Sequence, residues 1–182
     1  ASGPTSYEQA VRDGYKPTIL NDMVTARALF NNLAKLDEES QSFERTLVWA
    51  DSLNRKFSIK SMNAFVFFTQ KFRETFATPG FLGRKNYPFW FKSAPMVYVR
   101  DKGQIVELIF DHLAFDRPVT VDEWTAYYTV DTLSPKAINP RLTHQTARCK
   151  EIDRFVDKGK KDRISSVESN GNEWCLVRKG PM

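Results

Sequence analysis

The sequence has few of the residues that build metal sites and thiol sites. Cysteine occurs only at Cys149 and Cys175, and histidine only at His112 and His144. Neither cysteine belongs to a CxxC pair, and no paired ligand spacing indicates a zinc site. Glycine-rich phosphate loops, HExxH and GxSxG motifs are also missing, which removes the usual signs of nucleotide, zincin and hydrolase-elbow sites. We expect neither a metal nor a cofactor.

Long hydrophobic runs are missing as well. No apolar stretch approaches the roughly 18 to 20 residues that a membrane-spanning helix needs, so we expect no association with a membrane. The polar start, "ASGPTSYEQAVRDGYKP", lacks the apolar centre of a signal peptide. With 182 residues and 41% hydrophobic content, the chain has enough apolar side chains for one core. We expect a polar N-terminal extension over residues 1–20 and a single domain over residues 21–182.

The two cysteines leave two states open. They form one disulfide bridge in an exported protein, or they are free buried thiols in a cytosolic one. An Ala-Ser start fits a mature form after cleavage of a leader as well as a trimmed chain. Our expectation is an exported protein, periplasmic or secreted, with a bridge between Cys149 and Cys175.

The positive charge is spread along the chain. The formal net charge is +5 and the pI is about 9.2, which suits an anionic partner such as nucleic acid. The densest basic run, "DKGKKDR" at 157–163, is interrupted by aspartates and a glycine, so it reads as a solvated loop or as an anion-binding patch. Nucleic-acid binding therefore rests on composition alone, and we expect a different partner.

Hydrophobic spacing predicts an α+β fold with helices packed on an antiparallel sheet. Apolar residues at helical spacing from Met23 to Leu36, with Asn21 or Asp22 as a cap, predict a first helix. A short extended segment is expected around Phe57–Ser61. From Asn63, the phenylalanines follow a period of three to four until Pro79 and Gly80, which predicts a helix with an aromatic face.

The second half of the chain reads mainly as strands. β-Branched and aromatic residues on both sides of Asp101-Lys102-Gly103 predict a hairpin. Thr120, followed by acidic residues, predicts the cap of a short helix. "EWCLVRKG" near the end predicts a final strand.

A helix that begins after "SMN" and packs on such a hairpin is an arrangement seen in thiol enzymes, where the helix terminus stabilises a thiolate. Three stretches, "SMNAF", "YPFWFKSAPMVYV" and "FDHLAFDRPVTVDEW", together with the Cys175–Met182 ending, resemble the bacterial protein-glutaminase (protein-glutamine deamidase) family. The resemblance implies a fold related to transglutaminases and papain-like proteases.

The resemblance also places the catalytic residues of that family. Its nucleophilic Cys falls on Ala64, its His on Lys92 and its Asp on Asp111, so only the Asp is retained. Deamidation through a thioester needs a thiolate and a proton donor for ammonia, and an alanine methyl supplies neither. We interpret the chain as an inactive relative. Two alternatives stay open: a deamidase that was disabled by an introduced substitution, which put Ala at position 64, or a deamidase that uses a relocated site.

Two further interpretations stay open at this site. Lys92 is either a desolvated lysine that acts as a base or the partner of Asp111 in a structural salt bridge. His112 follows Asp111, so strand alternation points it to the other face.

The expected function is that of a protein- or peptide-binding module that uses the old substrate cleft. Aromatic side chains supply contact area at low entropic cost, which makes Phe89, Trp90, Phe91 and Trp124 candidates for its rim. Packing in the core is the other interpretation of these four residues.

Overall fold

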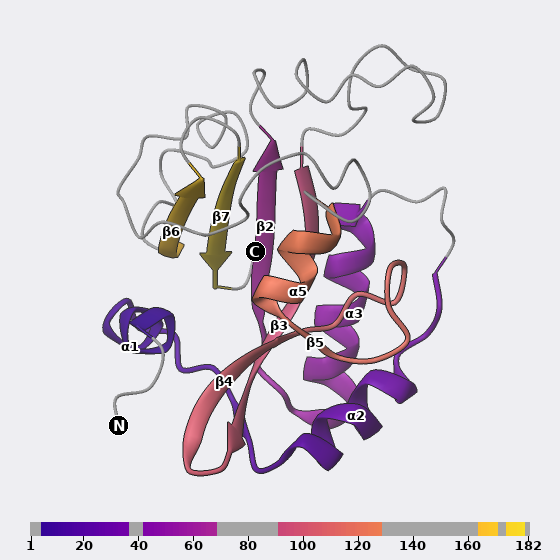
Figure 1. The fold of residues 1–182 in the computed structure, drawn as a ribbon. Coiled ribbons are helices and arrows are strands. Elements are labelled where there is room, and N and C mark those ends of the chain that lie inside the picture. The colour runs from indigo at the N-terminus through magenta and orange to yellow at the C-terminus, as the bar shows by residue number, and fades with distance from the viewer. Residues whose placement is uncertain (1–4, 37–41, 69–90, 129–163, 171–173, 181–182) are drawn as a thin grey trace.

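A mixed sheet with helices on both faces organises the molecule (Figure 1). The computed structural model describes residues 5–36, 42–68, 91–128, 164–170 and 174–180. Within these residues the sheet has seven strands in the order β5-β4-β3-β2-β7-β6, with β1 paired to β3. The elements are α1 (Thr5–Arg12), β1 (Ile19–Leu20), α2 (Met23–Asn32), α3 (Ser42–Phe57), β2 (Met62–Phe68), β3 (Phe91–Asp101), β4 (Gln104–Ile109), β5 (Val119–Thr120), α5 (Val121–Ala126), β6 (Ile164–Asn170) and β7 (Trp174–Lys179).

Each face of the sheet has its own buried cluster. On one face, Val97 and Val99 of β3 pack against α2 and α3, with Trp49 and Leu53 at the centre. On the other face, the alternate β3 residues join Trp124 and the residues around it. All pairings except that of β1 with β3 are antiparallel, so the predicted α+β class with helices on an antiparallel sheet is confirmed.

The helix predicted from Asn63 is wrong, because this segment forms strand β2. Strand β2 lies between β3 and β7, and residues 61–66 are all buried. A strand covered on both faces reads as a continuous apolar run, which the spacing of phenylalanines alone does not distinguish from a buried helix. The later phenylalanines of the predicted helix lie outside the described residues.

The predicted hairpin is confirmed. Strands β3 and β4 pair in register up to Asp101 and Gln104, which leaves Lys102 and Gly103 as the two-residue turn. Their φ angles of 51° and 78° are both positive, as a type I′ turn requires. Glycine at the second position adopts this conformation without steric cost. The final strand predicted from "EWCLVRKG" is also confirmed, as β7.

The first predicted helix is confirmed as α2, and Asp22 is its cap. The Asp22 carboxylate accepts a hydrogen bond from the backbone N–H of Thr25 at 2.7 Å, and this bond holds its pKa below the usual value. Helix α3 follows, and the extended segment expected from Phe57 is wrong at its start, because Phe57 is still the last helical residue.

The described part of the N-terminal segment, residues 5–20, is packed against the sheet. Ala10 of α1 is 2% exposed and belongs to the buried cluster under that helix. The Ser6 hydroxyl lies 2.8 Å from both the Tyr98 hydroxyl and the Glu107 carboxylate, and Arg178 pairs with the same carboxylate. Residues expected to extend from the domain thus contribute to its core.

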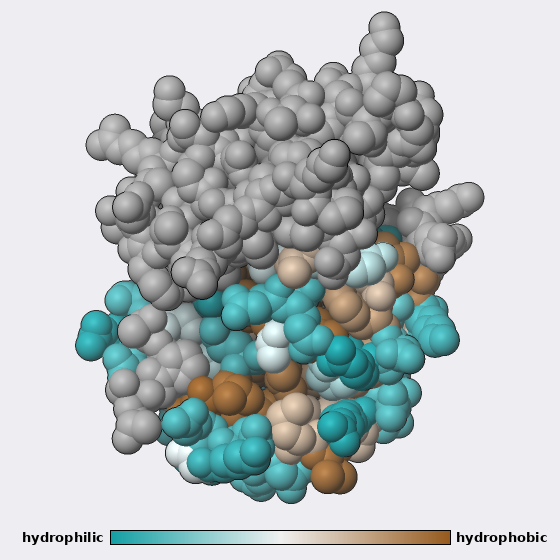
Figure 2. Space-filling model, in the orientation of Figure 1, coloured by the Kyte–Doolittle hydropathy of each residue, from teal (hydrophilic) through white to brown (hydrophobic). Residues whose placement is uncertain are grey.

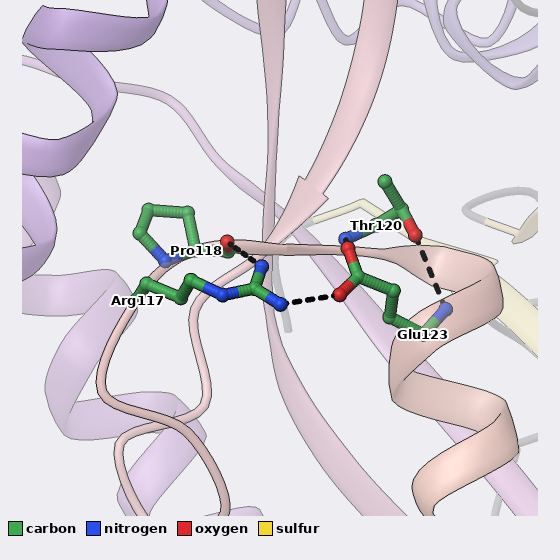
Figure 3. Close-up of polar contacts among 4 residues, drawn as sticks. All are labelled: Arg117, Pro118, Thr120 and Glu123. Carbon is green, nitrogen blue, oxygen red and sulfur yellow. Dashed lines mark hydrogen bonds and ion pairs between the residues drawn. The ribbon is translucent and has the colours of Figure 1, made fainter.

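The predicted Thr120 cap is confirmed as a complete capping box at the start of α5 (Figure 3). The Thr120 hydroxyl accepts from the Glu123 N–H at 3.1 Å, and the Glu123 carboxylate accepts from the Thr120 N–H at 3.2 Å. Arg117 also pairs with Glu123 at 2.6 Å, but both side chains are more than 40% exposed, so this pair adds little stability.

Substituting Thr120→Ala is expected to lower the free energy of unfolding by about 1 kcal/mol, because the N–H of Glu123 loses its acceptor. Urea denaturation followed by circular dichroism measures the change. Thr120→Ser keeps the hydroxyl and is the matched control. Equal stability of Thr120→Ala and the parent chain would contradict the importance of the cap.

Several expectations fall on other parts of the chain. The basic run at 157–163 and Cys149 lie outside the described residues, as does the side chain of Cys175, so the disulfide stays a prediction. Each helix in the described segments is too short or too polar to cross a lipid bilayer. In those same segments, no three His, Cys, Asp or Glu side chains gather as metal ligands would.

Candidate functional site

Asp111 is a buried carboxylate that accepts three hydrogen bonds. It lies two residues after the end of β4 and is 3% exposed. Its Oδ1 accepts from the backbone N–H of Leu113 at 3.0 Å, while its Oδ2 accepts from Trp124 Nε1 at 3.0 Å and from the Tyr128 hydroxyl at 2.8 Å. These donors fix the orientation of the carboxylate.

Lys92 lies near this carboxylate, on β3 opposite Val66 of β2. It is 7% exposed, and its Nζ is 5.6 Å from the centre of the Tyr128 ring. Burial, together with the positive charge of Arg45, lowers the pKa of Lys92 to about 8, and the charge of Asp111 opposes this shift only in part. Desolvation therefore outweighs the attraction of Asp111, and at pH 7 roughly a tenth of the lysine is neutral.

Helix α3 reaches the same end of β3. The hydroxyls of Thr46 and Ser93 are 2.9 Å apart and buried, which joins the first turns of α3 to the residue after Lys92. Arg45 is 3% exposed and brings its positive charge close enough to act on Lys92. The cluster thus combines residues from α3, β3, the end of β4 and the α5 segment.

Ala64 lies in the middle of a strand and not at a helix terminus. It is fully buried and pairs with Ala94 of β3 on one side and Arg178 of β7 on the other. The assignment of the family's nucleophile to Ala64 depended on a helix beginning there. The structure therefore removes the local geometry on which that assignment was built.

Helix α3 is the element that the sequence interpretation missed. It packs on β3, and it begins at Ser42, one turn before the Thr46 contact with Ser93. The signal for it was present in "SFERTLVWADSLNRKF", an uninterrupted stretch of 16 residues without glycine or proline. The resemblance implies a helix terminus beside the first hairpin strand. The first turns of α3, which contact β3 through Thr46 and Ser93, fit this expectation.

The aromatic candidates for a binding rim have different outcomes. Trp124 is fully buried and donates to Asp111, so its interpretation as a core residue is confirmed and its place on an exposed rim is wrong. Phe89 and Trp90 lie outside the described residues, as does the side chain of Phe91.

His112 points away from Asp111, as strand alternation predicted. Its Nε2 donates to the carbonyl of Phe30 at 2.6 Å, and its ring stacks on the Phe30 ring at 3.7 Å. Burial lowers its pKa below the usual value. His112 therefore links the segment after β4 to α2. It lies on the face of the sheet opposite Trp124 and Tyr128, which donate to Asp111.

The fold and this cluster define a class: an α+β domain in which a helix terminus, the first strand of a hairpin and the aspartate after its second strand meet. A protein-family model for glutaminases matches residues 21–128, a span that contains all of these elements. The chain belongs to the protein-glutaminase family.

Comparisons with individual proteins add a distant likeness. No curated protein was found to match the sequence. Among solved structures, the NMR structure of protein-glutaminase from Chryseobacterium proteolyticum is similar, with 17% sequence identity and a TM-score of 0.44. The match covers 61% of this chain and 64% of that one, so the chain spans less than two thirds of the protein that it resembles.

Proposed function

We propose that the chain is a protein-glutaminase-like domain without deamidase activity, which binds a protein or peptide through what remains of the family's substrate cleft. The observation that carries this proposal is Lys92, a buried lysine at the position where the family resemblance implies the catalytic histidine. Asp111 is retained, but its oxygens already accept bonds from Leu113, Trp124 and Tyr128.

The exchange of histidine for lysine removes a proton carrier that works near neutral pH. An imidazole with a pKa near 6.5 both accepts and returns a proton there. Lys92, with a pKa of about 8, is mainly an ammonium ion at pH 7, so most of it cannot take a proton from a nucleophile. The loss of the thiol removes the thioester route independently of Lys92.

Ammonia release from a glutamine-containing protein tests this proposal. The parent chain is expected to release none, and the double variant Ser42→Cys with Lys92→His is expected to restore release. That variant places a thiol at the start of α3 and an imidazole on β3.

A matched control separates the two positions considered for the nucleophile. Ala64→Cys with Lys92→His carries the same chemical groups, but its thiol lies in a fully buried strand position, so it is expected to stay inactive. Release by the parent chain itself would overturn the proposed loss of activity.

A second candidate function is an amidase with a relocated site, favoured by the lowered pKa of Lys92. A desolvated lysine acts as a general base once it is neutral. Hydrolysis of a glutamine peptide would then rise with pH to a plateau above about 8. Lys92→Met would abolish it. A chain that is silent from pH 6 to 10 excludes this candidate.

The partner we propose is a protein or peptide, and not nucleic acid. The described surface in the view of Figure 2 is mixed, with hydrophobic residues interspersed among hydrophilic ones. Such a surface suits a polar peptide better than a purely apolar partner. Export to the periplasm or the medium belongs to the same proposal.

A further inference from the structure

A pocket of about 480 Å³ lies on the α2 side of the sheet, away from Trp124 and Tyr128. It is lined by Lys35, shortly after α2, and by residues 112–117, which follow β4. This size falls within the range of small-molecule sites. The pocket is therefore a candidate site of its own, separate from the side-chain cluster around Asp111.

The segment that forms one wall of the pocket is held in a tight turn by Asp111. The N–H of Leu113 donates to Asp111 Oδ1 at 3.0 Å, and the N–H of Phe115 donates to the Asp111 carbonyl at 3.0 Å. Arg117, at the end of the segment, is paired with Glu123 at 2.6 Å (Figure 3). These bonds fix the wall in advance, so a ligand has little ordering to impose when it binds.

One ring nitrogen of His112 is an open acceptor. Its Nε2 lies 2.6 Å from the carbonyl of Phe30, and because a carbonyl only accepts, Nε2 carries the ring proton. In the neutral ring Nδ1 is then an acceptor. Among the described residues no donor bonds to Nδ1, and Nδ1 is not one of the polar atoms that are both unpartnered and shielded from solvent. A ligand that meets Nδ1 must therefore bring an O–H or N–H group.

The charges around the pocket favour an anion. Lys35 and Arg117 line it against a single carboxylate, that of Asp116. Burial is the largest cause that lowers the pKa of His112, so its ring is mainly neutral near pH 7. The positive charge of Lys35 lowers this pKa further, while Asp111 acts in the opposite direction. The charge of Lys35 therefore acts at the His112 ring, and a negatively charged ligand on Nδ1 lies in the same favourable field.

We propose that this pocket binds free hydrogen phosphate, whose P–O–H group donates to His112 Nδ1 in the positive field of Lys35. Hydrogen phosphate carries an O–H donor and negatively charged oxygens on one phosphorus atom, so it satisfies the acceptor and the field together. Sulfate is similar in shape and charge, but it carries no proton near pH 7, so its oxygens repel the lone pair of Nδ1. The phosphate site does not depend on the proposed function.

Titration of the full chain with inorganic phosphate near pH 7, followed by long-range ¹H–¹⁵N NMR of the histidine rings, tests the proposal. The Nδ1 signal of His112 is expected to shift and to saturate at millimolar phosphate. Sulfate is expected to bind about tenfold more weakly. Methyl phosphate is mainly a dianion without a proton near pH 7, because its second pKa is about 6, so it is also expected to bind more weakly. Equal binding of sulfate or of methyl phosphate, or no saturable shift of Nδ1, would overturn the proposal.

Variants locate the binding. His112→Phe keeps an aromatic ring beside Phe30 but has no Nδ1, so it is expected to bind phosphate about tenfold more weakly and to lose the preference over sulfate. Lys35→Met removes an exposed charge and is expected to weaken phosphate binding about threefold, which keeps the test decisive if His112→Phe does not fold. Lys56→Met, at an exposed lysine of α3 outside the pocket, is the matched control and is expected to leave binding unchanged. Equal effects of Lys35→Met and Lys56→Met would contradict the site.

Discussion

Replacing Asp111 with alanine is expected to lower the free energy of unfolding by about 3 to 5 kcal/mol, the range for removal of one member of a buried charged network. The reason is that Trp124 and Tyr128 each lose a buried acceptor, and the ammonium of Lys92 loses the nearby negative charge. Chemical denaturation at pH 7 measures the effect.

Two controls show whether this cost comes from the buried network. Asp116→Ala removes an exposed carboxylate five residues later and is expected to change stability by less than about 0.5 kcal/mol. Asp111→Asn keeps the shape and one acceptor, so it is expected to fall between the parent and Asp111→Ala. A cost for Asp111→Ala close to that of Asp116→Ala would refute the role of Asp111 as an anchor of the α5 segment.

The second large effect is an increase in stability with pH that depends on Lys92. The folded pKa of about 8 lies below the usual value of 10.5, so between these values the unfolded chain binds more protons than the folded one. Stability therefore rises from pH 8 toward pH 10.5, by about 3 kcal/mol in total. Below pH 8 the lysine is protonated in both states, and its unfavourable desolvation is fully present.

Substituting Lys92→Met is expected to remove this rise, and urea titrations at pH 7, 8, 9 and 10 measure it. Lys60→Met, at an exposed lysine, is the matched control and should keep the rise. Tyr15 and Tyr98 act in the opposite direction above pH 10, because burial raises the pKa of both phenols. A parent chain whose stability is flat between pH 8 and 10 would show that Lys92 is not desolvated in the folded state.

The sequence predicted the elements whose ends are set by turn residues or by a helix cap. Lys102 and Gly103 require positive φ angles, and the spacing of Thr120 and Glu123 is that of a capping box, so both the hairpin and α5 were found. Asp111 was singled out through its place after a strand in a family pattern, and its role in the site stays a prediction. Its three donors were not predicted, because Trp124 and Tyr128 meet it only after α5 packs on the sheet.

Tertiary burial explains the errors. Strand β2 is covered on both faces, so its apolar run lost the alternation that marks a half-exposed strand. In α3 the pattern is inverted in places, since Arg45 and Thr46 are buried while Leu47 and Val48 are 39% and 48% exposed. Mixed polarity of this kind hides a helix from periodicity, so α3 was not predicted from the sequence.

The pairing of β1 with β3 protects the domain against aggregation through intermolecular strand pairing. Strand β2 covers β3 only as far as Met96, and β1 continues along the same strand at Tyr98 and Val99. Strands β1 and β2 thus pair with successive parts of the same edge of β3. Without residues 1–20, the backbone N–H and C=O groups at Tyr98 and Val99 would form an open edge ready to pair with a neighbouring chain. The N-terminal segment therefore has two roles: Ala10 contributes to the core, and β1 covers a strand edge that would otherwise be open to aggregation.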